Sequence, residues 1–283
     1  MQEEDLGTGM VGGLTLWRKH VRELCHLYRS KDLVVSYPKS GRTWHNVMLC
    51  RYIEMAFGDA SSLSIESESV TAAAGFSRLS YTHNGAKFVY AIPPHHRINA
   101  DPLIWRGRRV LLLIRDPRDV LVSAHAHALH RSRSFQGSLS AFIRHPFTGI
   151  EKILVAQTRW HQYRPLARGV MVMKYEDLRK DPRAGLAATL EFLGIPVHAH
   201  TVAEAASFAD FDNMKKMEVS GDFRSNAMRP KGSGAGAMKV RSGKIGGFVD
   251  HLTGSDLEFI DRKIAEIGDP LGSLGASPVN SAG

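Results

Sequence analysis

The chain has 283 residues, of which 43% are hydrophobic and 23% charged, which excludes a disordered or fibrous protein and is typical of a folded one. This length is near the upper end of what one hydrophobic core supports, so a single α/β domain is expected. The 37 Lys and Arg residues exceed the 28 Asp and Glu residues by 9, so we expect anionic partners.

Cysteine usage and the N-terminus predict a cytoplasmic protein. Cys25 and Cys50 stand far apart and form no Cys-x-x-Cys pair, so neither a disulfide framework nor a cysteine zinc site is expected. No stretch approaches the roughly 20 apolar residues that a membrane helix requires. The first residues, Met-Gln-Glu-Glu-Asp, have the wrong charge for a signal peptide. We therefore expect no membrane insertion.

The first part of the chain predicts a helix followed by a strand, a turn and a second helix. Apolar residues at helical spacing over 14–28 indicate an N-terminal helix. The apolar, β-branched run 33–36 predicts a strand, and the residues at 37–41 predict a turn. Apolar residues then recur at intervals of three and four over 44–55, which predicts a helix.

The same order of strand, turn and helix recurs twice further along the chain. Residues 110–114 are apolar on both faces, as in a buried parallel strand, and Arg115-Asp-Pro-Arg-Asp119 follows them. Residues 170–173 predict another strand, and a helix runs beyond Asp181-Pro182 to Gly194. Three such units predict an α/β fold in which helices flank a central parallel sheet.

The C-terminal part contains a basic, glycine-rich segment over 229–247, a helix over 256–267 and a tail rich in Gly, Ser and Pro. We therefore divide the chain into an N-terminal helical segment (1–32), a single domain (33–268) and a flexible tail (269–283).

Two of the strand-to-helix turns are candidate anion sites. Lys39-Ser-Gly-Arg-Thr43 lies where backbone N–H groups and the positive helix end converge, but it lacks the Walker A pattern, which disfavours a plain ATPase or GTPase. Arg115 lies at the carboxyl end of its strand, with Ser123 on the next helix. The alternative is a surface ion pair between Arg115 and Asp119. Two anion sites at neighbouring strand ends fit one ligand with two separated phosphates.

Five blocks of the sequence, in this order, resemble the signature blocks of sulfotransferases that use 3′-phosphoadenylyl sulfate (PAPS). They cover the chain from about residue 33 to 260 and are Tyr37-Pro-Lys-Ser-Gly-Arg-Thr-Trp44, Arg115-Asp-Pro-Arg-Asp-Val-Leu-Val-Ser123, Lys174-Tyr-Glu-Asp-Leu178, Phe211-Asp-Asn-Met-Lys-Lys216 and Arg241-Ser-Gly-Lys-Ile-Gly-Gly-Phe248. The resemblance implies sulfuryl transfer from PAPS to a hydroxyl or amine of a small-molecule or glycan acceptor, with release of PAP. It also implies a P-loop-like turn for the phosphosulfate.

The resemblance assigns three groups of nucleotide-binding residues. The 5′-phosphosulfate would contact Lys39, Ser40, Gly41, Arg42, Thr43 and Trp44. The 3′-phosphate would contact Arg115, Ser123, Arg241, Ser242 and Gly243. The adenine would lie among the aromatic rings of Trp44, Tyr175 and Phe211. The family often has Arg-Lys-Gly at 241–243, so Lys239 or Lys244 is a candidate for the missing cation. The segment 229–247 is expected to be a lid over the nucleotide.

Sulfuryl transfer also needs a base for the acceptor proton and a cation on the leaving-group side. Lys39 suits the leaving group. His83, in Tyr81-Thr-His83, resembles the family's catalytic histidine, although the family's neighbouring residues differ here. His95 and His96 are the alternative candidates.

Other functions are disfavoured by what the sequence lacks. His125-x-His127-x-x-His130 does not place its histidines on one helix face, so no metal site is expected. The alternatives are a P-loop kinase of small metabolites and a polyanion-binding protein, but the Walker motif and a basic stripe with interleaved aromatic residues are both absent. We therefore expect no nucleic-acid partner. The acceptor and the oligomeric state stay open.

Overall fold

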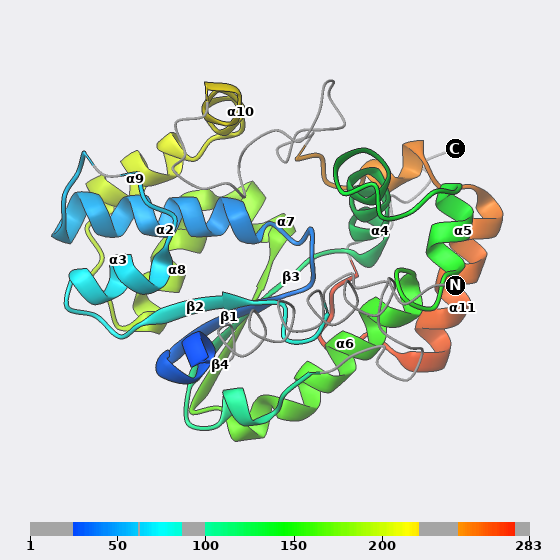
Figure 1. The fold of residues 1–283 in the computed structure, drawn as a ribbon, viewed down its shortest axis with the longest axis horizontal. Helices are drawn as coiled ribbons and strands as arrows, with labels where there is room; N and C mark the ends of the chain where they lie inside the picture. The colour runs from blue at the N-terminus through cyan, green and yellow to red at the C-terminus, as the bar shows by residue number, and fades with distance from the viewer. Residues whose placement is uncertain (1–24, 62, 87–99, 221–242, 275–283) are drawn as a thin grey trace, which may run out of the picture.

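The computed structural model describes residues 25–61, 63–86, 100–220 and 243–274 (Figure 1). Within these ranges no helix has the length and apolar character needed to cross a membrane. Of the predicted helix over 14–28, the structure describes residues 25–28, and these are helical, as is residue 29. The predicted lid over 229–247 is described only for residues 243–247. The predicted tail over 269–283 is described only for residues 269–274.

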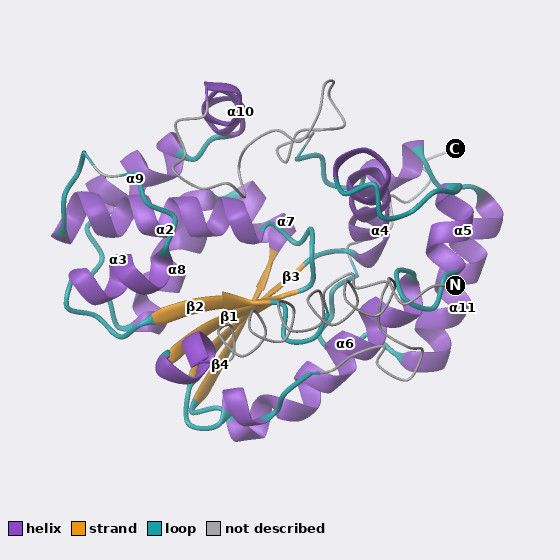
Figure 2. Cartoon of the chain, in the orientation of Figure 1, coloured by secondary structure: helices purple, strands orange, loops and turns teal. Residues whose placement is uncertain are grey.

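The described fold is built on a sheet of parallel strands in the order β2-β1-β3-β4 (Figure 2). The strands are β1 (Asp32–Ser36), β2 (Leu79–Thr82), β3 (Arg109–Ile114) and β4 (Gly169–Lys174). The predicted central parallel sheet is therefore confirmed. Strand β2 was not predicted, because three of the four residues of this edge strand, Leu-Ser-Tyr-Thr, carry hydroxyl groups and the strand has little apolar signal.

Helices cover both faces of the sheet (Figure 1). One face packs against α2 (Arg42–Phe57), α3 (Ser67–Ala73), α8 (Pro182–Leu193) and α9 (Ala199–Phe208). The other packs against α4 (Pro117–Ala126), α5 (Leu139–Arg144), α6 (Ile150–Tyr163) and α11 (Gly254–Ile267). Successive residues of a strand point to opposite faces, so Val110 and Leu112 enter one core and Leu111 enters the other.

Further elements are found in the described part of the chain. They are η2 (Leu103–Trp105), the π turn η3 (His127–Arg131), η4 (Arg164–Leu166), α7 (Tyr175–Lys180), α10 (Phe211–Ser220) and η6 (Gly247–Asp250). Helix α11 begins two residues before its predicted start, because Thr253 and Asp256 form a capping box at its N-terminus.

A buried histidine joins three elements behind the turn at residues 37–41. His45 of α2 lies 2.7 Å from the Tyr81 hydroxyl of β2 and 3.0 Å from the Thr189 hydroxyl of α8. Because Thr189 donates its own proton to the Gly185 carbonyl, His45 Nε2–H donates to Thr189 and Nδ1 accepts from Tyr81. Burial lowers the pKa of His45 to about 4, so the ring is neutral near pH 7.

Candidate active site

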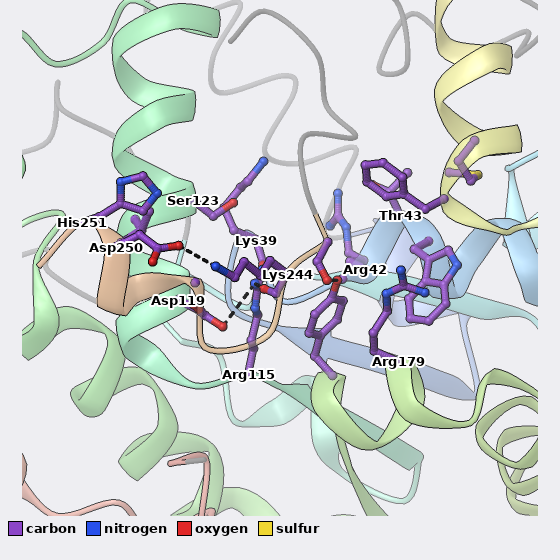
Figure 3. Close-up of a pocket in the computed structure, with 18 residues that line it drawn as sticks. Lys39, Arg42, Thr43, Arg115, Asp119, Ser123, Arg179, Lys244, Asp250 and His251 are labelled. Atoms are coloured by element: carbon purple, nitrogen blue, oxygen red, sulfur yellow. Dashed lines mark hydrogen bonds and ion pairs between the residues drawn. The ribbon is translucent and has the colours of Figure 1, made fainter. Parts of the chain in front are cut away.

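Most of the predicted nucleotide-binding residues gather around one cavity at the carboxyl ends of β1, β3 and β4 (Figure 3). The cavity has a volume of about 260 Å³. Its lining includes the predicted residues Lys39, Gly41, Arg42, Thr43, Trp44, Arg115, Ser123, Tyr175, Phe211 and Gly243. This position is expected for a ligand of an open α/β sheet, because the turns that leave parallel strands meet at that edge.

The turn after β1 brings its backbone close to the cavity. Lys39 has φ 76° and Gly41 has φ 88°, so the chain reverses tightly before α2 begins. A Cβ at Gly41 would lie 2.5 Å from Cδ2 of Tyr175, so only glycine fits without displacing that ring. Ser40, which was predicted to bind the phosphosulfate, is buried and is not among the cavity-lining residues, and its backbone N–H donates to the Tyr37 carbonyl.

Arg115 is held in place before any ligand arrives. Its Nη1 donates to the Lys39 carbonyl over 3.2 Å and its Nη2 donates to the Lys244 carbonyl over 3.0 Å. The guanidinium carbon lies 4.4 Å from the centre of the Tyr175 ring. Its buried Nε has no hydrogen-bond partner among the described residues. The ion pair between Arg115 and Asp119, considered above as the alternative to an anion site, is present at 3.5 Å, but it lies in the cavity and not on the surface.

Aromatic rings form another wall of the cavity. Trp44 donates its indole N–H to the Ala209 carbonyl over 2.6 Å, which fixes the ring next to Tyr175, at 5.9 Å between centroids. Arg179 places its guanidinium 5.8 Å from the Trp44 ring, and the sequence reasoning missed it. The available signal was its position four residues after Tyr175 on a helix, which puts both side chains on one face.

Residues 243–251 close one side of the cavity. The Tyr175 hydroxyl donates to the Gly243 carbonyl over 3.4 Å. The Asp119 carboxylate accepts the backbone N–H groups of Gly246 and Phe248, at 2.9 and 3.0 Å. This use of Asp119 could not be predicted, because its partners lie more than a hundred positions further along the chain.

Further polar residues missed by the sequence reasoning, Asp250 and His251, line the same side of the cavity (Figure 3). Lys244, considered in the sequence as a replacement cation, lies here too and pairs with Asp250 at 2.5 Å. The lining cations are Lys39, Arg42, Arg115, Arg179 and Lys244, against the carboxylates of Asp119 and Asp250. The cavity is therefore suited to an anion that also carries a flat ring.

The candidate base His83 follows β2 and is not among the cavity-lining residues. Its Nδ1 lies 2.7 Å from the Ser36 carbonyl at the end of β1, and a carbonyl only accepts, so Nδ1 carries a proton. In the neutral ring the lone pair is then on Nε2, as a general base requires. The alternatives His95 and His96 lie outside the described residues, as do Arg241, Ser242 and Lys239.

No group of three or more His, Cys, Asp or Glu side chains in the described ranges is arranged to hold a metal ion.

Burial raises the pKa of Glu176, whose Oε1 accepts the Asp116 backbone N–H over 3.0 Å behind the cavity. Burial also raises the pKa of the Tyr175 hydroxyl, so this group is a neutral donor near pH 7.

Comparison with known proteins gives a consistent result. Residues 29–267 match the family model of the sulfotransferase domain. Rat sulfotransferase 2A1 is 23% identical over 88% of this chain and 89% of its own length. A guinea pig 3-alpha-hydroxysteroid sulfotransferase is 23% identical over 86% of both chains.

Solved structures share the fold. Retinol dehydratase in complex with androsterone and PAP superposes with a TM-score of 0.60 at 16% identity, covering 88% of this chain and 82% of that one. A mouse sulfotransferase complexed with PAP gives 0.58 at 19% identity, covering 84% of each. At these identities the likeness concerns the fold.

Proposed function

This chain belongs to the sulfotransferase family, and from that membership we propose that it transfers a sulfuryl group from PAPS to an acceptor hydroxyl or amine and releases PAP. The observation that supports this most strongly is one cavity in which cations from two neighbouring strand ends meet an aromatic wall. A nucleotide with phosphates at both its 5′ and 3′ positions needs that combination.

The donor nucleotide would lie across the cavity in the orientation that the sequence resemblance implies. The adenine would lie among Trp44, Tyr175 and Phe211, all of which line the cavity. The 3′-phosphate would contact Arg115 and Ser123, and we assign the additional cation to Lys244, whose carbonyl already accepts from Arg115.

The 5′-phosphosulfate would lie at the β1–α2 turn. Lys39, Arg42 and Thr43 line the cavity there, at the N-terminus of a 16-residue helix whose backbone N–H groups favour an anion. Arg241 and Ser242 remain assigned to the 3′-phosphate by resemblance.

In the proposed reaction, His83 Nε2 takes the acceptor proton while the acceptor oxygen or nitrogen forms a bond to sulfur. The bond from sulfur to the bridging phosphate oxygen breaks, and its electron pair remains on PAP. Lys39 stabilises the negative charge that develops on this leaving oxygen. The contact between His83 and the Ser36 carbonyl supports the assignment of His83 as the base, because it holds the imidazole ring and fixes its tautomer. Ser36 lies three residues before Lys39, so this contact is close in sequence to the proposed phosphosulfate turn.

We propose small molecules or glycans as acceptors and the cytoplasm as the location. The support for the acceptor is that the guinea pig relative is named a hydroxysteroid sulfotransferase. The support for the location is that a relative from Arabidopsis thaliana is named a cytosolic sulfotransferase. That relative is 22% identical over 82% of this chain and 72% of its own length. The acceptor site is expected to involve segments 57–80, 91–107 and 131–160.

The test is to incubate the purified chain with PAPS and a panel of phenols, steroids, sugar alcohols and amines, and to follow PAP release. Calorimetry with PAP in excess EDTA accompanies it. We expect acceptor-dependent PAP release and metal-independent PAP binding, because lining cations supply the charge that Mg²⁺ would provide. Binding that is lost in EDTA and restored by Mg²⁺ would instead favour a kinase.

A further inference from the structure

Asp119 is a buried carboxylate beside a cavity proposed to bind a polyanion. Its side chain is 3% exposed and lies 3.5 Å from the Arg115 guanidinium. By Coulomb's law alone, a negative charge there repels a phosphate and weakens its binding. The residue therefore needs a role other than charge.

The contacts of Asp119 indicate that role. Its two carboxylate oxygens each accept one backbone N–H group, from Gly246 and from Phe248. Both hydrogen bonds are of normal length, and together they fasten the start of η6 to the first turn of α4. The ring of Phe248 is packed beneath Arg118 of the same helix, at 4.2 Å, which adds a second attachment.

The fastened turn contributes directly to the proposed 3′-phosphate site. Gly243, Lys244 and Gly247 line the cavity, and the Lys244 carbonyl accepts from Nη2 of Arg115. Asp119 thus contacts both the Arg115 side chain and the turn that orients Arg115.

We propose that Asp119 is a positioning residue, which fastens the 243–248 turn against α4 and aligns Arg115 with it, so that this carboxylate strengthens binding of the 3′-phosphate despite its charge. This inference rests on the proposed use of PAPS.

The test compares two substitutions that remove the same charge from the same cavity. Asp119→Asn keeps the size of the side chain but replaces one acceptor oxygen with an N–H₂ donor that faces a backbone N–H. Asp250→Asn is the matched control, because the exposed Asp250 pairs with the Lys244 side chain and accepts no backbone N–H group from the described residues. Affinities for PAP and for AMP, which lacks the 3′-phosphate, are measured by calorimetry.

We expect Asp119→Asn to weaken PAP binding about tenfold, equivalent to about 1.4 kcal/mol, and to weaken AMP binding less than about threefold. Asp250→Asn should bind PAP as tightly as the wild type or more tightly. If Asp119→Asn binds PAP as tightly as the wild type, or weakens PAP and AMP equally, the positioning role is wrong. If the wild type binds no PAP, the proposed function fails first, and this inference with it.

A measurement on the wild type covers the case in which the variant does not fold. Hydrogen exchange followed by mass spectrometry reports on the amides of residues 243–251. We expect slow exchange before ligand is added and further slowing with PAP but not with AMP. Fast exchange in both states would overturn the inference.

Discussion

Replacing Arg115 by alanine tests the proposed phosphate site most directly. The guanidinium is almost fully buried, makes hydrogen bonds to the Lys39 and Lys244 carbonyls, and has a buried Nε without a partner among the described residues. The substitution removes a fixed cation from the cavity and leaves those carbonyls without their donor.

The size of the effect follows from the kind of contact that is lost. A hydrogen bond to a charged group contributes about 1.5–3 kcal/mol, so losing one to the 3′-phosphate should weaken PAP about 10- to 150-fold. The bonds to Lys39 and Lys244 connect parts of the protein to one another, so their loss affects every ligand of the cavity alike. AMP should therefore weaken much less than PAP.

The assay is calorimetry with PAP and AMP on Arg115→Ala and on the control Arg179→Ala. Arg179 lines the same cavity beside Trp44, on the side proposed for the adenine, so its loss should weaken both ligands to a similar extent. Equal weakening of PAP and AMP by Arg115→Ala would refute the reasoning and show that Arg115 supports the fold and not the phosphate.

Three further predictions concern catalysis, pH and the turn. His83→Ala should lower kcat about 10²–10⁴-fold with PAP affinity unchanged, and the loss should be smaller with an acidic nitrophenol; an inactive His95→Ala or His96→Ala variant beside a normal His83 variant would contradict this. In the folded protein the His45 ring is neutral, with a pKa of about 4, whereas in the unfolded chain it takes up a proton near pH 6.5. The free energy of unfolding, measured with urea, should therefore fall by about 2 kcal/mol between pH 7 and 5 because of His45. His45→Gln should remove this pH dependence. Gly41→Ala should destabilise the fold by about 1–3 kcal/mol in the same assay, and by more than Gly75→Ala, which has a similar φ of 81° but nothing within 4 Å of its added Cβ.

The sequence by itself determined the fold class, the family and most of the cavity lining. Apolar runs such as 110–114 and the turn residues after them act over a few positions, so a strand and the helix that follows it can be inferred locally. Parallel strands then place their carboxyl ends at one edge, which brings Lys39, Arg115 and Tyr175 together without knowledge of any contact.

The tertiary structure decided what depends on segments far apart in the chain. Strand β2 is short and carries little apolar signal, so its place beside β1 follows from pairing and not from its own residues. Asp119 lies 127 positions before Gly246, and His83 lies 47 positions after Ser36. A carboxylate in a local motif is compatible with an ion pair, a cap or an anchor, because only the folded chain determines which donors reach it.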